Sequence, residues 1–150
     1  MVSAKRPAGL GCPQARARPL MSGLLVVDTD VLIDYLRDLP QAVAFLEGSD
    51  QVLAASVITV AELYAGVRDG EERKRLDAFV EAFDLIALND KSAVVAGLWR
   101  RQYGRSHGTG LADALIAATA DGVGGTLVTL NQRHFPMLPN LLIAYRKPSP

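Results

Sequence analysis

Three acidic residues of this sequence stand alone among apolar neighbours. Asp28 directly follows the apolar run LLVV, Glu62 is the only charged residue between positions 51 and 67, and Asp113 is the only acid between positions 106 and 120. Burying an ionised carboxylate without a partner is costly. Carboxylate oxygens are ligands that Mg²⁺ and Mn²⁺ prefer, whereas the chain has no cluster of Cys or His for zinc. We therefore expect the three acids to share one Mg²⁺ ion, with Mn²⁺ as the alternative.

Two of these acids, and the neighbouring Asp30, also have an alternative role that needs no metal. Asp28 and Asp30 stand where a helix is expected to begin, and Asp113 follows a glycine turn. Backbone N–H groups and the helix dipole stabilise acids at such positions. Glu62 lies too far inside its predicted helix to cap it, so Glu62 is the stronger indication of a metal site. Asp34 is expected at an exposed helix position.

Short apolar runs alternate with longer helical segments, which is typical of βα units and a parallel sheet. The pattern predicts strands over 24–27, 52–55, 85–88, 126–130 and 141–145. It predicts helices over 31–38, 41–47, 57–67, 71–83, 91–103 and 111–120. The expected fold class is α/β with a mostly parallel sheet of about five strands. Because residues beyond the carboxyl ends of such strands meet in one crevice, the three acids are expected to converge there.

The composition indicates one globular domain. The chain has 150 residues, of which 49% are hydrophobic, and no apolar stretch approaches the ~20 residues of a membrane span. The formal charge is zero, but residues 21–150 carry a net charge of −4. Binding to RNA must therefore be local or helped by metal, because phosphate contacts need Lys and Arg. The single cysteine, Cys12, excludes an internal disulfide and is compatible with the cytoplasm, the expected location.

The first residues differ from the rest. The first twenty hold three prolines, four basic residues and no acid, a composition typical of disorder. We expect a disordered basic leader over residues 1–22 and one folded domain over residues 23–147. Met21 directly precedes the first strand, so one alternative is that the leader reflects a misassigned start. A second alternative is a basic arm that touches RNA.

Four motifs follow one another along the chain: DTD at 28–30, TVAE at 59–62, LADALIAATA at 111–120 and TLNQRHF at 129–135. With them, the sequence from Leu24 to Tyr145 resembles the PIN-domain family, and most of all its VapC toxins of bacterial toxin–antitoxin pairs. The resemblance implies a three-layer α/β/α sandwich and a metal-dependent endoribonuclease. It further implies cleavage of RNA to a 5′-phosphate and a 3′-hydroxyl, a homodimer, and a cognate VapB-like antitoxin that plugs the site.

Carried over position by position, the resemblance assigns metal-binding or catalytic roles to Asp28, Glu62, Asp113, Thr129 and Asn131. The three acids match the family's metal ligands, and the other two match its polar positions after a strand. Many relatives have a further acid in the last segment, where this chain has Asn131 and His134. A second metal is therefore left open. Asp30 stands where Asn or Ser is common among relatives and offers additional negative charge nearby.

Other interpretations of the same residues remain open. Four arginines are candidates for phosphate contacts because their guanidinium groups present a planar fork of donors: Arg100, Arg101, Arg105 and Arg133. An ordinary exposed surface is the alternative for the first three. DTD after an apolar strand is also similar to HAD-type phosphatases, whose later Lys and acidic pair have no counterpart here. A binding module without activity is the other alternative, favoured by the missing acid in the last segment.

Overall fold

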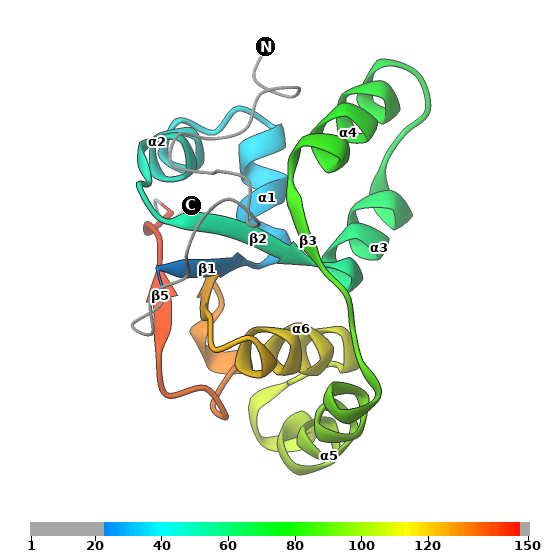
Figure 1. Ribbon diagram of the computed structural model, residues 1–150, viewed down its shortest axis with the longest axis vertical. Coiled ribbons are helices and arrows are strands. Elements are labelled where there is room, and N and C mark those ends of the chain that lie inside the picture. The colour runs from blue at the N-terminus through cyan, green and yellow to red at the C-terminus, as the bar shows by residue number, and fades with distance from the viewer. Residues whose placement is uncertain (1–22, 148–150) are drawn as a thin grey trace.

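The computed structural model describes residues 23–147, so the predicted leader, with Cys12 and Met21, lies outside the described residues. Five strands form one sheet in the order β3-β2-β1-β4-β5 (Figure 1), and every neighbouring pair is parallel. The α/β class is confirmed, and the sheet is wholly rather than mostly parallel. The strands are β1 (Leu24–Val27), β2 (Val52–Ser56), β3 (Asp84–Ile86), β4 (Thr126–Thr129) and β5 (Leu141–Ile143).

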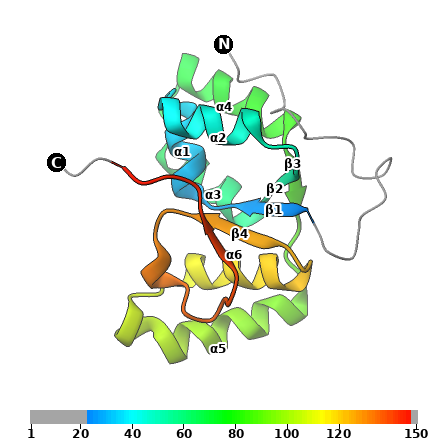
Figure 2. The same ribbon diagram turned by 90° about the vertical axis from the view of Figure 1, so that its left-hand side faces the viewer.

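Helices cover both faces of the sheet. Figures 1 and 2 show α1, α2, α3 and α4 on one side of the sheet, and α6 on the other side with α5 packed outside it. This is the three-layer arrangement that the family resemblance implies. The helices are α1 (Thr29–Leu36), α2 (Pro40–Gly48), α3 (Val57–Gly66), α4 (Glu71–Ala82), α5 (Asp90–His107), α6 (Leu111–Gly122) and the short 3₁₀ helix η2 (Gln132–His134).

Alternate residues of the central strand pack into different cores. Leu25 and Val27 of β1 join the apolar cluster under α1, α2 and α4, whereas Leu24 and Val26 join the cluster under α6. All four are buried because helices cover both faces, which explains why a central parallel strand is apolar throughout rather than alternating. The carboxylate of Asp28 is the first polar side chain that follows.

The strand order reverses its direction beside β1. From β1 the chain moves outward to β2 and β3, and it then returns to β4 on the opposite side of β1. Ligands of open α/β sheets bind beyond the carboxyl ends of the strands at such a switch point. Asp28 N donates a hydrogen bond to Val128 O at 2.8 Å and so joins the ends of β1 and β4. Residues that follow these two strands are therefore the ones positioned for chemistry.

Two helix boundaries differ from prediction for local reasons. α1 begins at Thr29 rather than at position 31, because Asp28 accepts a hydrogen bond from Thr29 N and caps the helix. α5 continues past position 103 to His107 and ends at Gly108, whose φ of 68° is the left-handed conformation favoured by glycine after a helix. Within residues 23–147, no helix combines the length and apolar character needed to cross a bilayer.

Candidate active site

Asp28 forms the centre of the site. Its side chain is 6% exposed, and it accepts hydrogen bonds from Thr29 N and from Thr129 Oγ1, both at 2.8 Å. Thr129 is the last residue of β4 and is fully buried. Asn131 N donates to the same Thr129 oxygen at 3.1 Å. Three of the five predicted site residues are thus linked directly at the ends of β1 and β4.

Asp30 ties the start of α1 to the chain that leaves β4. One carboxylate oxygen accepts from Val31 N at 2.8 Å, and the other accepts from Leu130 N at 3.0 Å and lies 3.4 Å from Thr129 Oγ1. The carboxylate is therefore held by backbone donors of the segments that follow β1 and β4. Asp30 thus has a positioning role in the structure that the sequence left undefined.

Glu62 reaches the site through a threonine that sequence reasoning missed. Thr29 Oγ1 donates to Glu62 Oε1 at 2.6 Å and lies 3.2 Å from Thr59 Oγ1. The signal for Thr29 was its place between the two acids of the DTD motif. Glu62 itself is exposed, so the expectation of three acids enclosed by apolar neighbours is wrong for it: the apolar residues around Glu62 in the sequence point to other sides of α3.

Asp113 lies in the first turn of α6 and completes the network. Its Oδ2 accepts from Gly110 N at 2.9 Å and lies 3.2 Å from His134 Nδ1. The same ring nitrogen lies 2.9 Å from Asn131 Nδ2. Asp113 is half-buried, with a side chain 26% exposed. The five predicted residues are thereby brought into one chain of contacts that runs through Thr29 and His134.

Capping does not balance the negative charge of Asp28. The hydrogen bonds from Thr129 and Thr29 lower its pKa, but burial, followed by repulsion from Asp30 and more weakly from Asp113, raises the pKa from 3.8 to about 7. Burial likewise raises the pKa of Asp30. The capping contacts of the metal-free interpretation are therefore present, but they do not outweigh the effect of burial and repulsion on the pKa of Asp28.

The donor set fits a divalent cation by its chemistry. Asp28, Asp113 and Glu62 offer carboxylate oxygens only, which suits Mg²⁺ or Mn²⁺. Across residues 23–147, however, no three His, Cys, Asp or Glu side chains lie close enough together to hold a metal ion as they stand. The reason is visible in the contacts, because Thr29 holds Glu62 on one side and Gly110 holds Asp113 on the other. Side-chain adjustment would be needed for all three to share one ion.

Asp34 is not the exposed residue that the sequence predicts. It is 5% exposed, and its Oδ2 accepts from Tyr145 Oη at 2.8 Å and from Lys147 Nζ at 2.9 Å. These partners come from the segment after β5, more than a hundred positions away in the sequence. The prediction failed because the C-terminal segment crosses the helix face that was expected to meet solvent.

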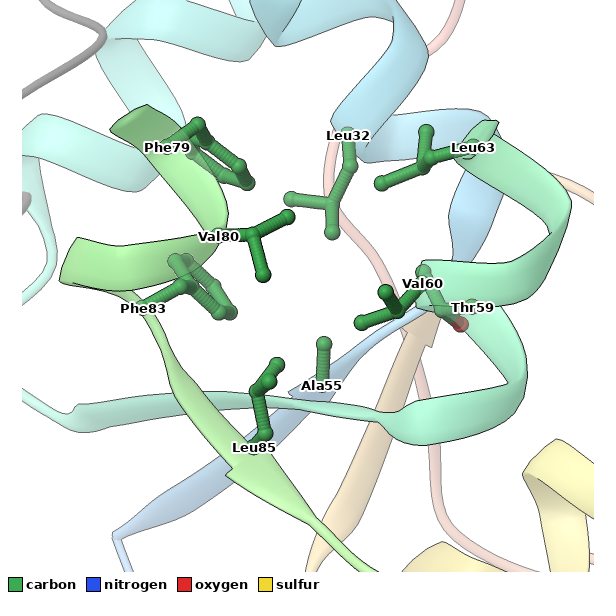
Figure 3. Close-up of a pocket in the computed structure, with 9 residues that line it drawn as sticks. All are labelled: Leu32, Ala55, Thr59, Val60, Leu63, Phe79, Val80, Phe83 and Leu85. Carbon is green, nitrogen blue, oxygen red and sulfur yellow. The ribbon is translucent and has the colours of Figure 1, made fainter. Parts of the chain in front are cut away.

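A small apolar pocket is lined in part by Thr59, whose Oγ1 lies 3.2 Å from Thr29 Oγ1. Figure 3 shows side chains from α1, β2, α3, α4 and β3 pointing into one space between α3 and α4. Tyr64 Oη donates to Asp77 Oδ1 at 2.6 Å and joins these two helices. The lining residues are Leu32, Ala55, Thr59, Val60, Leu63, Phe79, Val80, Phe83 and Leu85. The pocket offers a hydrophobic surface and no catalytic group.

Comparison with known proteins identifies the family. The sequence pattern of the PIN domain matches residues 25–139. The chain belongs to the PIN-domain family. Ribonuclease VapC19 of Mycobacterium tuberculosis is 39% identical to this PIN domain over 124 residues, which cover 80% of this chain and 98% of VapC19. Ribonuclease VapC10 of the same organism is 41% identical over 121 residues, which cover 79% of this chain and 90% of VapC10.

A solved structure agrees with these relatives. A chain of a toxin–antitoxin complex from Klebsiella pneumoniae superposes on this PIN domain with a TM-score of 0.70 and 27% identity, covering 83% of this chain and 99% of that chain. The predicted resemblance to PIN domains and their VapC members is confirmed. The phosphatase alternative loses its support, because the DTD motif lies within the matched PIN domain.

Proposed function

We propose that this PIN domain is a VapC-type toxin, a metal-dependent endoribonuclease that hydrolyses RNA and is inhibited by a VapB-like antitoxin. The observation that carries the proposal is the network of Asp28, Glu62, Asp113, Thr129 and Asn131 at the switch point beside β1. The similarity to two proteins named ribonucleases supports the reaction class. Repulsion among the acids supports the need for a cation.

The site residues have different roles in the proposed phosphodiester hydrolysis. Asp28, Glu62 and Asp113 would hold a Mg²⁺ or Mn²⁺ ion, which lowers the pKa of water and offsets charge on the phosphate. Thr29 N and Thr129 Oγ1 orient the Asp28 carboxylate, and Thr29 Oγ1 orients Glu62. Among the hydrogen bonds of residues 23–147, Glu62 uses only Oε1. We assign Oε2 of this exposed carboxylate to accept the proton of the attacking water.

Cleavage of total RNA tests the proposal. The purified full chain is incubated with RNA and Mg²⁺ or Mn²⁺, and a parallel sample contains EDTA. Asp113→Asn and Glu62→Gln remove one negative charge each from the site, whereas Asp121→Asn makes the same change at an exposed position at the end of α6. We expect metal-dependent cleavage that both site variants lose and the Asp121 variant keeps.

The contrary outcomes are separable. Cleavage that persists in EDTA would contradict the metal requirement, and cleavage by both folded site variants would contradict the assignment of the site. If the wild type neither cleaves RNA nor binds a divalent ion by calorimetry, the binding module without activity becomes the better interpretation. Turnover, rather than metal binding alone, separates the enzyme from that alternative.

Inhibition by an antitoxin rests on charge complementarity at the same site. Closely spaced carboxylates are a natural receptor for an inserted guanidinium group, which pairs with them through charge-assisted hydrogen bonds. A short peptide with a central Arg is expected to inhibit cleavage, while the same peptide with Gln in that place is not. Equal rates at saturating concentrations of either peptide would contradict this mode of inhibition.

A homodimer and a cytoplasmic location complete the proposal. The homodimer follows from the family resemblance and the cytoplasmic location from the single cysteine, and sedimentation of the purified chain tests the first. The folded domain is proposed to span residues 23–147, in agreement with a PIN match that covers residues 25–139.

A further inference from the structure

The charged residues of the domain divide between its two halves. Residues 23–90 contain fourteen acidic and five basic residues, a net charge of −9. Residues 91–147 contain seven basic and two acidic residues, a net charge of +5. The first half includes α1 to α4, on one side of the sheet, and also Asp90, the first residue of α5. The second half includes the rest of α5 and α6, on the other side (Figure 1), and also Lys147, which pairs with Asp34 of α1 at 2.9 Å. The segment from Asp90 to His134, with α5, α6 and η2, keeps five basic residues against three acidic ones. The overall negative charge of the domain therefore conceals a mildly basic side.

Most basic residues of the first half have acidic partners, whereas most of the second half have none within residues 23–147. In the acidic half, Arg68, Arg73 and Arg75 each form an ion pair, with Glu72 at 3.3 Å, Asp77 at 3.3 Å and Asp38 at 2.8 Å respectively. In the basic half, Lys147 pairs with Asp34, but the five exposed arginines form neither an ion pair nor a hydrogen bond within residues 23–147: Arg100, Arg101, Arg105, Arg133 and Arg146. Arg146 follows β5, and we call the other four the arginine patch. Within the described residues, their guanidinium donors are free for an anionic ligand.

Two members of the arginine patch flank the turn that leads into the site. A side-chain carbon on Gly104 would collide with Arg100 Nη1 and lie 3.5 Å from Thr109 O, so Arg100 rests against Gly104 near this turn. A side-chain carbon on Gly108 would lie 3.6 Å from Arg133 Nη1. The same turn reaches Asp113 through Gly110. Arg100 and Arg133 therefore stand close to one of the proposed metal ligands.

A buried hydrogen bond fixes this arrangement. Thr109, which is 1% exposed, donates from Oγ1 to His134 O at 2.8 Å. The contact joins the turn after α5 to the 3₁₀ helix η2 that carries Arg133. The arginines of α5 and the arginine of η2 therefore lie on two segments that the structure holds together beside the site.

The other two members extend the arginine patch along α5. Arg101 and Arg105 are four residues apart in a continuous helix, so they share one face about 6 Å apart along the axis. No acidic residue occurs in the sequence between Lys91 and Asp113. A polyanion that follows this surface meets positive charge until it arrives at the carboxylates.

We propose that the arginine patch is the surface over which a single RNA strand enters the carboxylate site, and this inference rests on the function proposed above. The arginines bind phosphates of the strand on one side of the scissile bond and take no part in the chemistry. Helices α1 to α4, on the opposite side of the sheet, contain eight acidic and three basic residues, which disfavours phosphates there. The direction of entry is thus set by the charge division, and the mildly acidic chain binds RNA through a local surface.

Binding without turnover tests the proposal. Fluorescence anisotropy of a labelled 12-nucleotide single-stranded RNA of mixed sequence is measured with the full chain in EDTA, between 50 and 300 mM salt. The test variant carries Arg101→Gln and Arg105→Gln. The matched control is Arg37→Gln, because Arg37 is also exposed and without an ion pair in residues 23–147 but lies in the acidic half. Circular dichroism confirms that each variant is folded.

The expected effects follow from counterion release. For single strands the binding constant varies with salt to the power of about −0.7 for each phosphate contact, so one contact is worth about fivefold at 0.1 M salt. Losing two contacts should weaken binding about 25-fold and reduce the salt slope by about 1.4. The Arg37 variant should bind within twofold of the wild type. Asp113→Asn should keep RNA binding while it loses cleavage.

Several results would overturn the inference. Wild-type binding that is undetectable at 50 mM salt, or a double variant that matches the wild type in affinity and salt slope, would show that the patch does not bind RNA. Equal losses in the Arg37 variant would show that the charge effect is not local. Tighter binding of a 12-base-pair duplex than of the single strand would contradict the choice of a single strand. If the wild type binds RNA through the arginine patch but does not cleave it, the proposed function is refuted while the inference about the patch stands.

Discussion

Replacement of Asp28 by Asn is expected to stabilise the metal-free protein at neutral and alkaline pH. The buried carboxylate has its pKa raised from 3.8 to about 7 by burial and by repulsion from Asp30 and Asp113. The folded state therefore binds a proton that the unfolded state has released. Stability that is present below pH 4 is lost as the pH rises towards 7, because the folded protein must then ionise a group in an unfavourable environment. Asparagine has no such charge.

The size of the effect follows from the same shift. A displacement of about three pKa units corresponds to about 4 kcal/mol across the whole range, and the interval from pH 5 to pH 8 contains about 3 kcal/mol of it. The amide keeps an acceptor for Thr29 N but exchanges the acceptor facing Thr129 Oγ1 for a donor, which costs about 1 kcal/mol at every pH. Between pH 5 and pH 8, the free energy of unfolding of the variant should rise by about 3 kcal/mol relative to that of the wild type.

Urea unfolding of both proteins in EDTA measures this difference. With a slope of about 2 kcal/mol per molar urea, the gap between the two midpoints should change by about 1.5 M from pH 5 to pH 8. Addition of Mg²⁺ at about 100 times its dissociation constant should stabilise the wild type by about 3 kcal/mol and the variant much less. Midpoints that run parallel from pH 5 to pH 8 would refute the reasoning, since Asp28 would then titrate alike in the folded and unfolded states.

Three further substitutions test other parts of the structure. Thr29→Val removes the hydroxyl that orients Glu62 and should weaken Mg²⁺ binding roughly tenfold or more, with little change in stability; unchanged affinity by calorimetry would contradict the orienting role. Asp34→Ala leaves Lys147 and Tyr145 without their acceptor and should lower the free energy of unfolding by about 2 kcal/mol, a figure kept low because the Lys147 side chain is half exposed to solvent. A loss below about 0.5 kcal/mol in urea unfolding would mean that this contact does not hold the C-terminal segment. Leu127→Ala opens a cavity in a fully buried strand and should cost about 2–5 kcal/mol in the same assay, and a cost under about 1 kcal/mol would indicate that the core under α6 collapses around it.

The sequence determined the elements of this protein because its apolar periods are local and strong. The short apolar runs around β1 and β2 indicated buried strands, and the longer amphipathic segments between strands indicated helices. The placing of helices on both faces of the sheet came from the family resemblance. The isolation of three acids and the four ordered motifs then identified the candidate site and the family. Helix ends were less certain, because Asp28 and Gly108 set them through backbone contacts and dihedral angles that apolar periodicity does not record.

Tertiary structure alone decided how the carboxylates are held and where charge lies. Whether an acid is buried depends on which distant segments pack over it. Glu62 is exposed, whereas Asp34, which was expected in solvent, is covered by a segment far along the chain. The roles of Thr29 and His134 likewise require distances between segments that meet only when β4 pairs with β1. The charged residues can be counted in the sequence. Their separation onto two sides of the sheet arises because the chain completes one layer of helices before it builds the other.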